Sequence, residues 1–138
     1  MNESLLVVDR AELRPYELPL IRALPLRFGR LETRRGWTLR ISADGYTGVG
    51  EAAPLAGFTP ESADEVETAL SRWARSARGQ AFRVTPDAVD LGPTPIPAVA
   101  RSAIEGAMAD LAARRSGAPL HRWLGAGAAA HVGVNATL

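Results

Sequence analysis

Apolar and polar residues alternate along two stretches of the first half of the chain. Leu5–Leu13 begins as an apolar run and then alternates, and Gly36–Ala43 alternates throughout, with its odd-numbered positions apolar. Because successive side chains of a strand point to opposite faces, each stretch is predicted to be a strand with one buried face. Between them, Pro15–Arg35 has no steady period and exceeds the usual hairpin connection of about 2 to 5 residues. It is predicted to be a long loop that is functional or mobile.

A turn signal follows the second of these strands. Asp44-Gly45 suits a type I′ turn, whose two central residues need positive φ, which Asp tolerates and Gly adopts freely. The returning strand is predicted to run from Tyr46 to about Ala53, which gives a three-stranded antiparallel meander. Gly48 and Gly50 lie inside this strand, where glycine indicates a bulge or the close approach of another backbone.

The second half of the chain changes to the period of a helix. Thr59-Pro60-Glu61 combines a capping residue, a proline suited to the first helical position and an acidic residue at the positive end of the dipole. A helix is predicted to begin there and to end at Gly79. After a polar connection over Gln80–Pro95, a second helix is predicted from Pro97 to about Ser116, and a helical turn at Leu120–Leu124. Strands followed by helices predict an α+β domain.

Apolar residues recur every three or four positions in both helices, which predicts one buried face on each. These positions are Val66, Ala69, Leu70, Trp73, Ala74 and Ala77 in the first helix and Val99, Ala100, Ala103, Ile104, Ala107, Met108 and Leu111 in the second. Small residues on the second helix would let another element approach closely. Further on, Gly125–Ala130 is predicted to be a hinge and His131–Leu138 a strand, which suggests that the chain continues.

Composition excludes several classes of function. Sixteen basic and fifteen acidic residues nearly cancel and are interspersed, so neither nucleic acid nor a membrane is a predicted partner. Without cysteine there are no disulfides, thiolate catalysis or cysteine-ligated metals. All sixteen basic residues are arginines, which are too basic to act as general bases near neutral pH. No apolar run approaches the ~20 residues of a membrane helix and no signal peptide is recognisable, so a cytoplasmic location is predicted.

Few polar residues have the spacing of a catalytic or metal-binding site. His121 and His131 are ten residues apart without a third ligand, so surface or interface roles are favoured. Glu105 and Asp110 lie five apart and project to different sides of a helix, which favours solvation or pairing with arginine. Glu51 ends a strand, and a structural role, accepting backbone N–H bonds from its own loop, is favoured.

The aromatic residues divide into two groups. Trp37, Trp73 and Trp123 each fall on the apolar face of an element, which favours core packing. Leu55 and Phe58 instead lie on a Pro/Gly loop, where burial is not guaranteed. For these two residues, ligand contact and packing on a neighbouring domain are both open.

Four segments together resemble a known family. They are Leu31–Trp37, Gly48–Glu61, Pro97–Leu111 and Pro119–Gly125. They resemble the N-terminal capping domain of the enolase superfamily, over nearly the whole chain. The Gly-Glu-x-x-Pro-Leu-x-Gly-Phe form of the second segment is most similar to the o-succinylbenzoate synthase family, the dehydratases of the menaquinone pathway. Dipeptide epimerases and muconate cycloisomerases share the Gly-Glu and second-helix patterns.

The resemblance implies an enzyme whose chemistry lies outside this chain. Residues 1–125 would be a capping domain, and residues 126–138 a hinge and the start of the first strand of a (β/α)₇β barrel that is absent from this chain. In the family that barrel carries two catalytic lysines and the carboxylates that bind Mg²⁺, which assists proton abstraction next to a carboxylate before water is lost. We therefore expect no catalytic residue, metal ligand or cofactor on this chain, and no activity of the chain alone.

The resemblance assigns the chain two loops that select the substrate. Leu26–Leu31 looks like a lid over the substrate and Pro54–Phe58 like a loop that shapes the pocket. The implied substrate-binding residues are Leu26, Phe28, Arg30, Pro54, Leu55, Gly57 and Phe58. The implied partners are a small-molecule carboxylate substrate and the chain's own C-terminal barrel, with an oligomer through the exposed barrel-facing surface as a further prediction.

Two other interpretations stay open. One keeps the superfamily and changes the substrate to a dipeptide or to muconate. The other is a non-catalytic interaction module, which would bind another protein through the Leu55/Phe58 loop and the small-residue face of the second helix, because exposed apolar patches usually mark partner surfaces.

Overall fold

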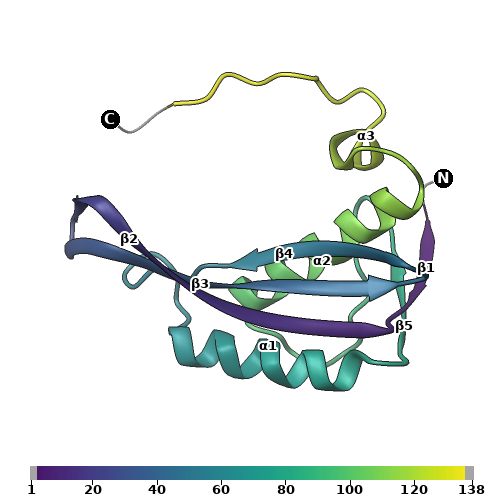
Figure 1. Cartoon of the computed structure of the whole chain (residues 1–138), viewed down its shortest axis with the longest axis horizontal. Coiled ribbons are helices and arrows are strands. Elements are labelled where there is room, and N and C mark those ends of the chain that lie inside the picture. The colour runs from purple at the N-terminus through teal and green to yellow at the C-terminus, as the bar shows by residue number, and fades with distance from the viewer. Residues whose placement is uncertain (1–2, 136–138) are drawn as a thin grey trace.

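The computed structural model describes residues 3–135 and contains five strands and three helices over that range (Figure 1). The strands are β1 (Ser4–Val7), β2 (Arg10–Leu26), β3 (Gly29–Ala43), β4 (Tyr46–Ala52) and β5 (Ala81–Val84), and the helices are α1 (Ala63–Ala77), α2 (Ala98–Arg115) and α3 (Leu120–Leu124). β2, β3 and β4 form an antiparallel meander, while β1 pairs with β5 in a separate two-stranded sheet. The predicted α+β class and three-stranded meander are confirmed.

β2 and β3 are longer than predicted, so the interpretation of Pro15–Arg35 as a loop is wrong. The two strands stay paired as far as Leu26 and Gly29, with a register shift between Pro19 and Leu24. β4 pairs only with the last part of β3. The rest of β2 and β3 forms a two-stranded ribbon that extends beyond the meander (Figure 1). Prolines hide the strand period in the sequence. They are tolerated because β2 is an edge strand, where a missing N–H need not break a ladder bond.

The first predicted strand, Leu5–Leu13, is in fact divided between β1 and β2. Between them the backbone changes partners: Val8 bonds to the chain that leads into β5, whereas Asp9 bonds to the end of β3. β5 itself lies in the connection predicted over Gln80–Pro95. A strand of four residues is too short for its period to stand out in the sequence.

The turn between β3 and β4 forms at the predicted residues. Asp44 and Gly45 have φ of 52° and 81°, as a type I′ turn requires. β4 then runs from Tyr46 and ends at Ala52, one residue before the predicted end.

α1 begins three residues later than the sequence interpretation placed it. Its cap is Ser62, whose Oγ accepts a bond of 3.2 Å from Glu65 N–H, while Ser62 N–H donates to the Glu65 carboxylate at 2.7 Å. This reciprocal pair satisfies two free N–H groups at once, which a cap at Thr59 would not do. The same bonds hold the pKa of Glu65 below its ordinary value. α2 and α3 match their predicted ranges, with Pro97 and Ser116 as the caps of α2.

The core lies between the meander and the helices. α2 packs on β4 and β3, and α1 packs on β2. All three tryptophans are buried, as predicted, and the described core is formed by Leu6, Val8, Trp37, Leu39, Ile41, Ala43, Ala52, Val66, Leu70, Trp73, Ala77, Val84, Val89, Ala100, Ala103, Ile104, Ala107, Met108, Leu111, Ala112, Ala113 and Trp123.

The close backbone approach predicted at Gly48 and Gly50 is confirmed. A Cβ at Gly48 would lie 2.1 Å from Ala107 O, and one at Gly50 would lie 1.9 Å from Ala103 O. The small-residue face of α2 is therefore covered by β4. It is not available to another protein, as the interaction-module interpretation required.

The last segment differs from its prediction where it is described. Residues 131–135 form neither a strand nor a helix, and the remainder of the strand predicted at His131–Leu138 lies outside the described residues. None of the helices within residues 3–135 has the length and hydropathy of a membrane-spanning helix.

Candidate functional site

The ribbon tip, Leu26–Gly29, and the Pro54–Phe58 loop meet at one end of the molecule (Figure 1). Phe28 and Phe58 contact each other edge to face, with ring centroids 5.6 Å apart and an interplanar angle of 75°. Gly57 has a φ of +82°, and a Cβ there would lie 2.7 Å from the Phe28 ring. The structure thus brings together the two loops that the sequence analysis assigned to substrate binding.

The Pro54–Phe58 loop is held by its own hydrogen bonds. Phe58 N–H and Thr59 N–H both donate to Leu55 O at 2.9 Å. Thr59 Oγ1 accepts a bond of 3.1 Å from Leu55 N–H and so closes the turn from the other side. Thr59, predicted to cap α1, instead stabilises this loop.

Two further side chains tie the loop to the ribbon. Arg34 on β3 donates through Nη1 to Pro54 O at 2.9 Å and through Nη2 to Ala53 O. Tyr16 on β2 donates its hydroxyl to the Glu51 carboxylate at the end of β4. The predicted partner of Glu51, the backbone of its own loop, is therefore replaced by a tyrosine 35 positions away in the sequence.

Gly36 makes room for the Tyr16 side chain. A Cβ at Gly36 would lie 2.5 Å from Tyr16 Oη and 2.7 Å from Ala52 O. Tyr16 is paired with Gly36 in the β2–β3 register, so its ring lies over a position of β3 that has no side chain. Sequence analysis missed Tyr16 and Arg34 as site residues, although Arg34 and Gly36 belong to the Leu31–Trp37 segment that carries the family resemblance.

The environment of Tyr16 fixes its protonation state. Burial, followed by the hydrogen bond and the negative charge of Glu51, raises the pKa of Tyr16 from 10.0 to about 12, against a smaller lowering by Arg34. Tyr16 is therefore protonated at neutral pH. It donates its hydroxyl hydrogen bond to the Glu51 carboxylate.

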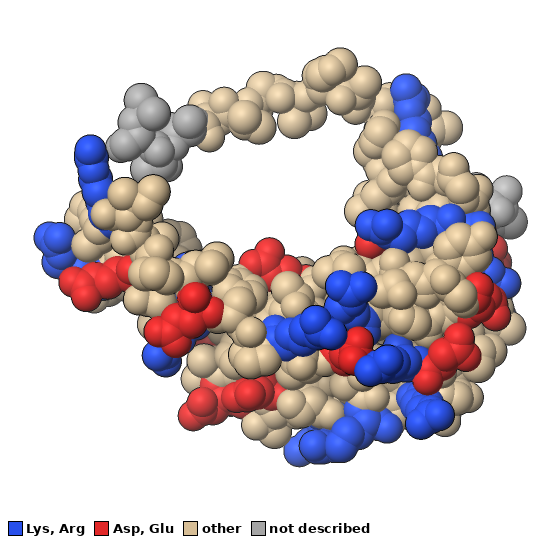
Figure 2. Space-filling model, in the orientation of Figure 1, with Lys and Arg blue, Asp and Glu red and all other residues tan. Residues whose placement is uncertain are grey.

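The predicted substrate-binding residues present a largely apolar surface. Phe58 is 71% exposed and Phe28 is 48% exposed in spite of their mutual contact. Arg30 and Gly57 are exposed, while Leu26, Pro54 and Leu55 are half-buried. Elsewhere on the face shown in Figure 2, basic and acidic side chains are interspersed. The two phenylalanines are thus available for contact with another molecule.

The remaining polar candidates are paired with arginine or are exposed to solvent. Arg101 Nε donates to Glu105 at 2.7 Å and Arg114 Nε to Asp110 at 3.0 Å, which confirms the predicted pairing with arginine. His121 is exposed, as is His131. Within residues 3–135, no group of three or more His, Asp or Glu side chains is placed to hold a metal ion.

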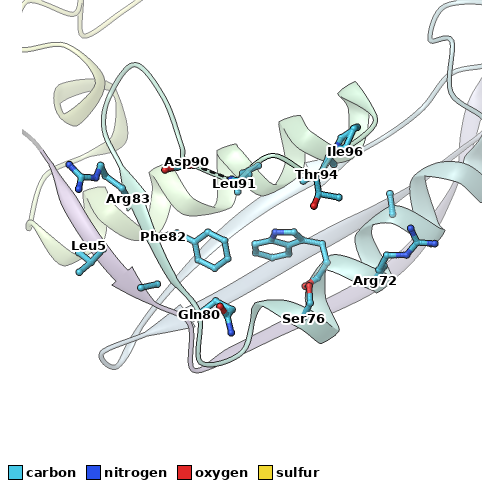
Figure 3. Close-up of a pocket in the computed structure, with 15 residues that line it drawn as sticks. Leu5, Arg72, Ser76, Gln80, Phe82, Arg83, Asp90, Leu91, Thr94 and Ile96 are labelled. Carbon is cyan, nitrogen blue, oxygen red and sulfur yellow. Dashed lines mark hydrogen bonds between the residues drawn. The ribbon is translucent and has the colours of Figure 1, made fainter.

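A separate pocket of about 750 Å³ lies between α1, β5 and the segment 90–96 (Figure 3). Trp73 and Phe82 line it with their rings 5.6 Å apart, and Arg72 and Arg83 line it with charged groups. None of the predicted substrate-binding residues belongs to its lining. The pocket and the paired loops are therefore distinct features.

Residues 8–111 match the family described as MenC, N-terminal domain. The chain belongs to this family. The matched range contains the meander, the ribbon tip, the Pro54–Phe58 loop and most of α2. Both loops of the candidate site are therefore part of the MenC N-terminal domain.

Curated relatives of this MenC domain are o-succinylbenzoate synthases. The protein of Klebsiella pneumoniae (strain 342) is 40% identical over 63 residues, which is 46% of this chain and 20% of that protein. The protein of Yersinia enterocolitica is 34% identical over 89 residues, which is 62% of this chain and 24% of that protein. The chain thus spans about a fifth to a quarter of the length of these relatives.

Solved structures give the fold of the MenC domain. A muconate lactonizing enzyme from Pseudomonas fluorescens, complexed with muconolactone, matches with a TM-score of 0.68 at 24% identity, over 87% of this chain and 34% of that one. The L-Ala-D/L-Glu epimerase from Bacillus subtilis matches with a TM-score of 0.68 at 23% identity, over 85% and 34%. An enolase from an alpha proteobacterium with bound Mg matches with a TM-score of 0.67 at 21% identity, over 88% and 35%. Together with the match to the MenC family, these structures confirm the resemblance to the enolase-superfamily N-terminal domain.

Proposed function

We propose that this chain is the N-terminal capping domain of an o-succinylbenzoate synthase-like dehydratase and that its paired loops form one side of the substrate pocket. One observation carries the proposal. The range that matches the MenC family contains two loops that contact each other and expose Phe28 and Phe58. The curated relatives named o-succinylbenzoate synthase favour this activity within the superfamily.

The loops would act by shape and by exclusion of water. Phe28 and Phe58 supply exposed aromatic surface, and half-buried Leu55 extends it. Arg30 lies next to the ribbon tip, where its exposed guanidinium can attract the carboxylate of a small-molecule substrate. A closed apolar wall strengthens electrostatic interactions in the pocket behind it.

The chemical step requires groups beyond this chain. Mg²⁺-assisted proton abstraction next to a carboxylate, followed by loss of water, needs metal ligands and a base. The described residues 3–135 do not fit a metal centre, the chain has no lysine, and Tyr16 stays protonated. We assign these groups to a C-terminal barrel and propose that residues 126–138 are the hinge and the start of its first strand, a strand that residues 131–135 do not form in this chain. A bound Mg in the alpha-proteobacterial neighbour supports a Mg²⁺-dependent reaction of the full-length protein. A cytoplasmic, menaquinone-forming enzyme is part of the same proposal.

The decisive experiment compares two proteins. The product of the full reading frame and the 138-residue chain are each assayed for conversion of the cyclohexadiene carboxylate precursor to o-succinylbenzoate with Mg²⁺ present. We expect turnover by the first and none by the second. Turnover by the isolated chain, or a full-length protein that does not dehydrate this substrate, contradicts the proposal.

An epimerase or a cycloisomerase is the second candidate within the superfamily. The muconate lactonizing enzyme and the L-Ala-D/L-Glu epimerase share this fold, so the fold alone does not choose between them. Assays of the full-length protein with dipeptides and with muconate separate these activities from dehydration.

The interaction module has less support, because β4 already covers the small-residue face of α2. Size-exclusion chromatography of the 138-residue chain tests this module and the proposed oligomer together. A monomer at high concentration counts against both, whereas a dimer supports an exposed interface.

A further inference from the structure

We propose that Arg34 is a positioning residue that holds the Pro54–Phe58 loop against the β2–β3 ribbon, so that ribbon tip and loop close over a ligand as one unit. The effect of this coupling on substrate binding rests on the proposed function. The coupling itself depends only on contacts within this chain.

The geometry of Arg34 carries the inference. Its guanidinium is half-buried and donates from two nitrogens to two successive carbonyls, Pro54 O at 2.9 Å and Ala53 O. These carbonyls follow directly after the end of β4, where the sheet no longer holds the chain. A planar guanidinium matches such a pair of acceptors, whereas an ammonium is a point donor. Arg34 thus fixes where the loop leaves the sheet.

The neighbouring arginine provides a contrast. Arg35 points to the other face of β3, where its side chain is 70% exposed and pairs with Glu17 at 3.1 Å. It has the same charge and lies on the same strand, but its partner is Glu17 and not the loop. Arg35 is therefore a matched control for Arg34.

Two more contacts join the β2–β3 ribbon to the Pro54–Phe58 loop, one at the base of the loop and one at its tip. Tyr16 bonds to Glu51 at the base of the loop, and Phe28 packs on Phe58 and Gly57 at its tip. Arg34 lies between these contacts and is the one that bonds the loop backbone directly. Without Arg34 the loop would lose its fixed position relative to Phe28, and its internal turn would open more often.

Hydrogen exchange of the loop amides tests the coupling without any activity assay. In Arg34→Gln, the amides of Leu55, Phe58 and Thr59 are expected to exchange about tenfold faster, because a charge-assisted pair of bonds no longer holds the loop. In Arg35→Gln, the same amides are expected to stay within about twofold of the unchanged chain. Core amides of β3 report whether each variant is folded.

Arg34→Lys keeps the charge but not the paired donors, and it is expected to exchange several-fold faster at the loop. If Arg34→Gln does not fold, the Arg34→Lys variant provides the same test. Loop exchange in a folded Arg34→Gln or Arg34→Lys variant that equals that of Arg35→Gln overturns the inference.

In the full-length enzyme, Arg34→Gln is expected to raise KM with little change in kcat, since it misplaces a binding wall and touches no reacting atom. An enzyme with a different activity leaves the exchange result standing and removes only the proposed function. An active dehydratase with unchanged loop exchange in Arg34→Gln removes only this inference.

Discussion

At the scale of single residues, glycine decides how closely the elements of this domain approach. Gly48 and Gly50 on β4 leave space for the backbone of α2, and Gly36 leaves space for Tyr16. Sequence analysis anticipated the first two, because glycine inside a strand indicates close approach. It does not predict the third, because Tyr16 lies in the segment Pro15–Arg35, whose pattern shows no strand period.

Gly50→Ala is expected to lower the free energy of unfolding by about 1 to 3 kcal/mol, because its Cβ would lie 1.9 Å from Ala103 O and the helix must move. Urea denaturation measures the change. Gly106→Ala is the control on the facing helix, where the nearest atom to an added Cβ is 3.9 Å away. There, alanine is expected to be neutral or stabilising by up to about 1 kcal/mol. Equal losses in the two variants contradict this account of β4 and α2.

The raised pKa of Tyr16 predicts a pH dependence with a definite sign. Between pH 10.0 and about 12 the unfolded chain loses the phenol proton while the folded chain keeps it, so stability falls as pH rises through this window. The contribution is fully present below pH 10.0. Thermal melting of Tyr16→Phe is expected to show a smaller decrease over the window than the unchanged chain. Tyr46→Phe, which removes the only other tyrosine, is expected to melt like the unchanged chain, and a reduced decrease there would contradict the assignment.

At the scale of elements, the sequence was informative where one local rule acted alone. The alternation of β3, the Asp44-Gly45 turn and the range of α2 were all predictable. The start of α1 lies at the capping box of Ser62 and Glu65, three residues after the start that Thr59 and Pro60 indicate. The ribbon was missed because prolines break its period, and only pairing with β3 makes it a strand.

The contact between the ribbon tip and the Pro54–Phe58 loop predicts energetic coupling. A double-mutant cycle of Phe28→Ala and Phe58→Ala, measured by urea denaturation, is expected to give an interaction energy of about 0.5 to 1.5 kcal/mol. A cycle of Ile21→Ala and Phe58→Ala is the control, because Ile21 is fully exposed on the ribbon. Additive effects of Phe28 and Phe58 would mean that the rings do not support each other in solution.

At the scale of the whole molecule, the candidate site combines residues that are far apart in the sequence. Leu55, Phe58 and Phe28 were predicted from the family resemblance. Their contact could not be predicted, because it depends on how far the ribbon extends. Tyr16 and Arg34 reach partners 35 and 20 positions away, and no local pattern marks such pairs. Local sequence patterns therefore predict most of the elements that carry the site. They do not predict the long-range contacts that bring its residues together.

The central claim is that the paired loops form a substrate-binding wall in an o-succinylbenzoate synthase. It is tested most directly by kcat/KM of the full-length enzyme for the cyclohexadiene carboxylate, in Phe58→Ala and in Val7→Ala. Val7 is another exposed apolar residue, on β1 and away from the loops (Figure 1). We predict a loss of about tenfold or more for Phe58→Ala, carried mainly by KM, and a change within about twofold for Val7→Ala. Equal values for the two variants would contradict the claim.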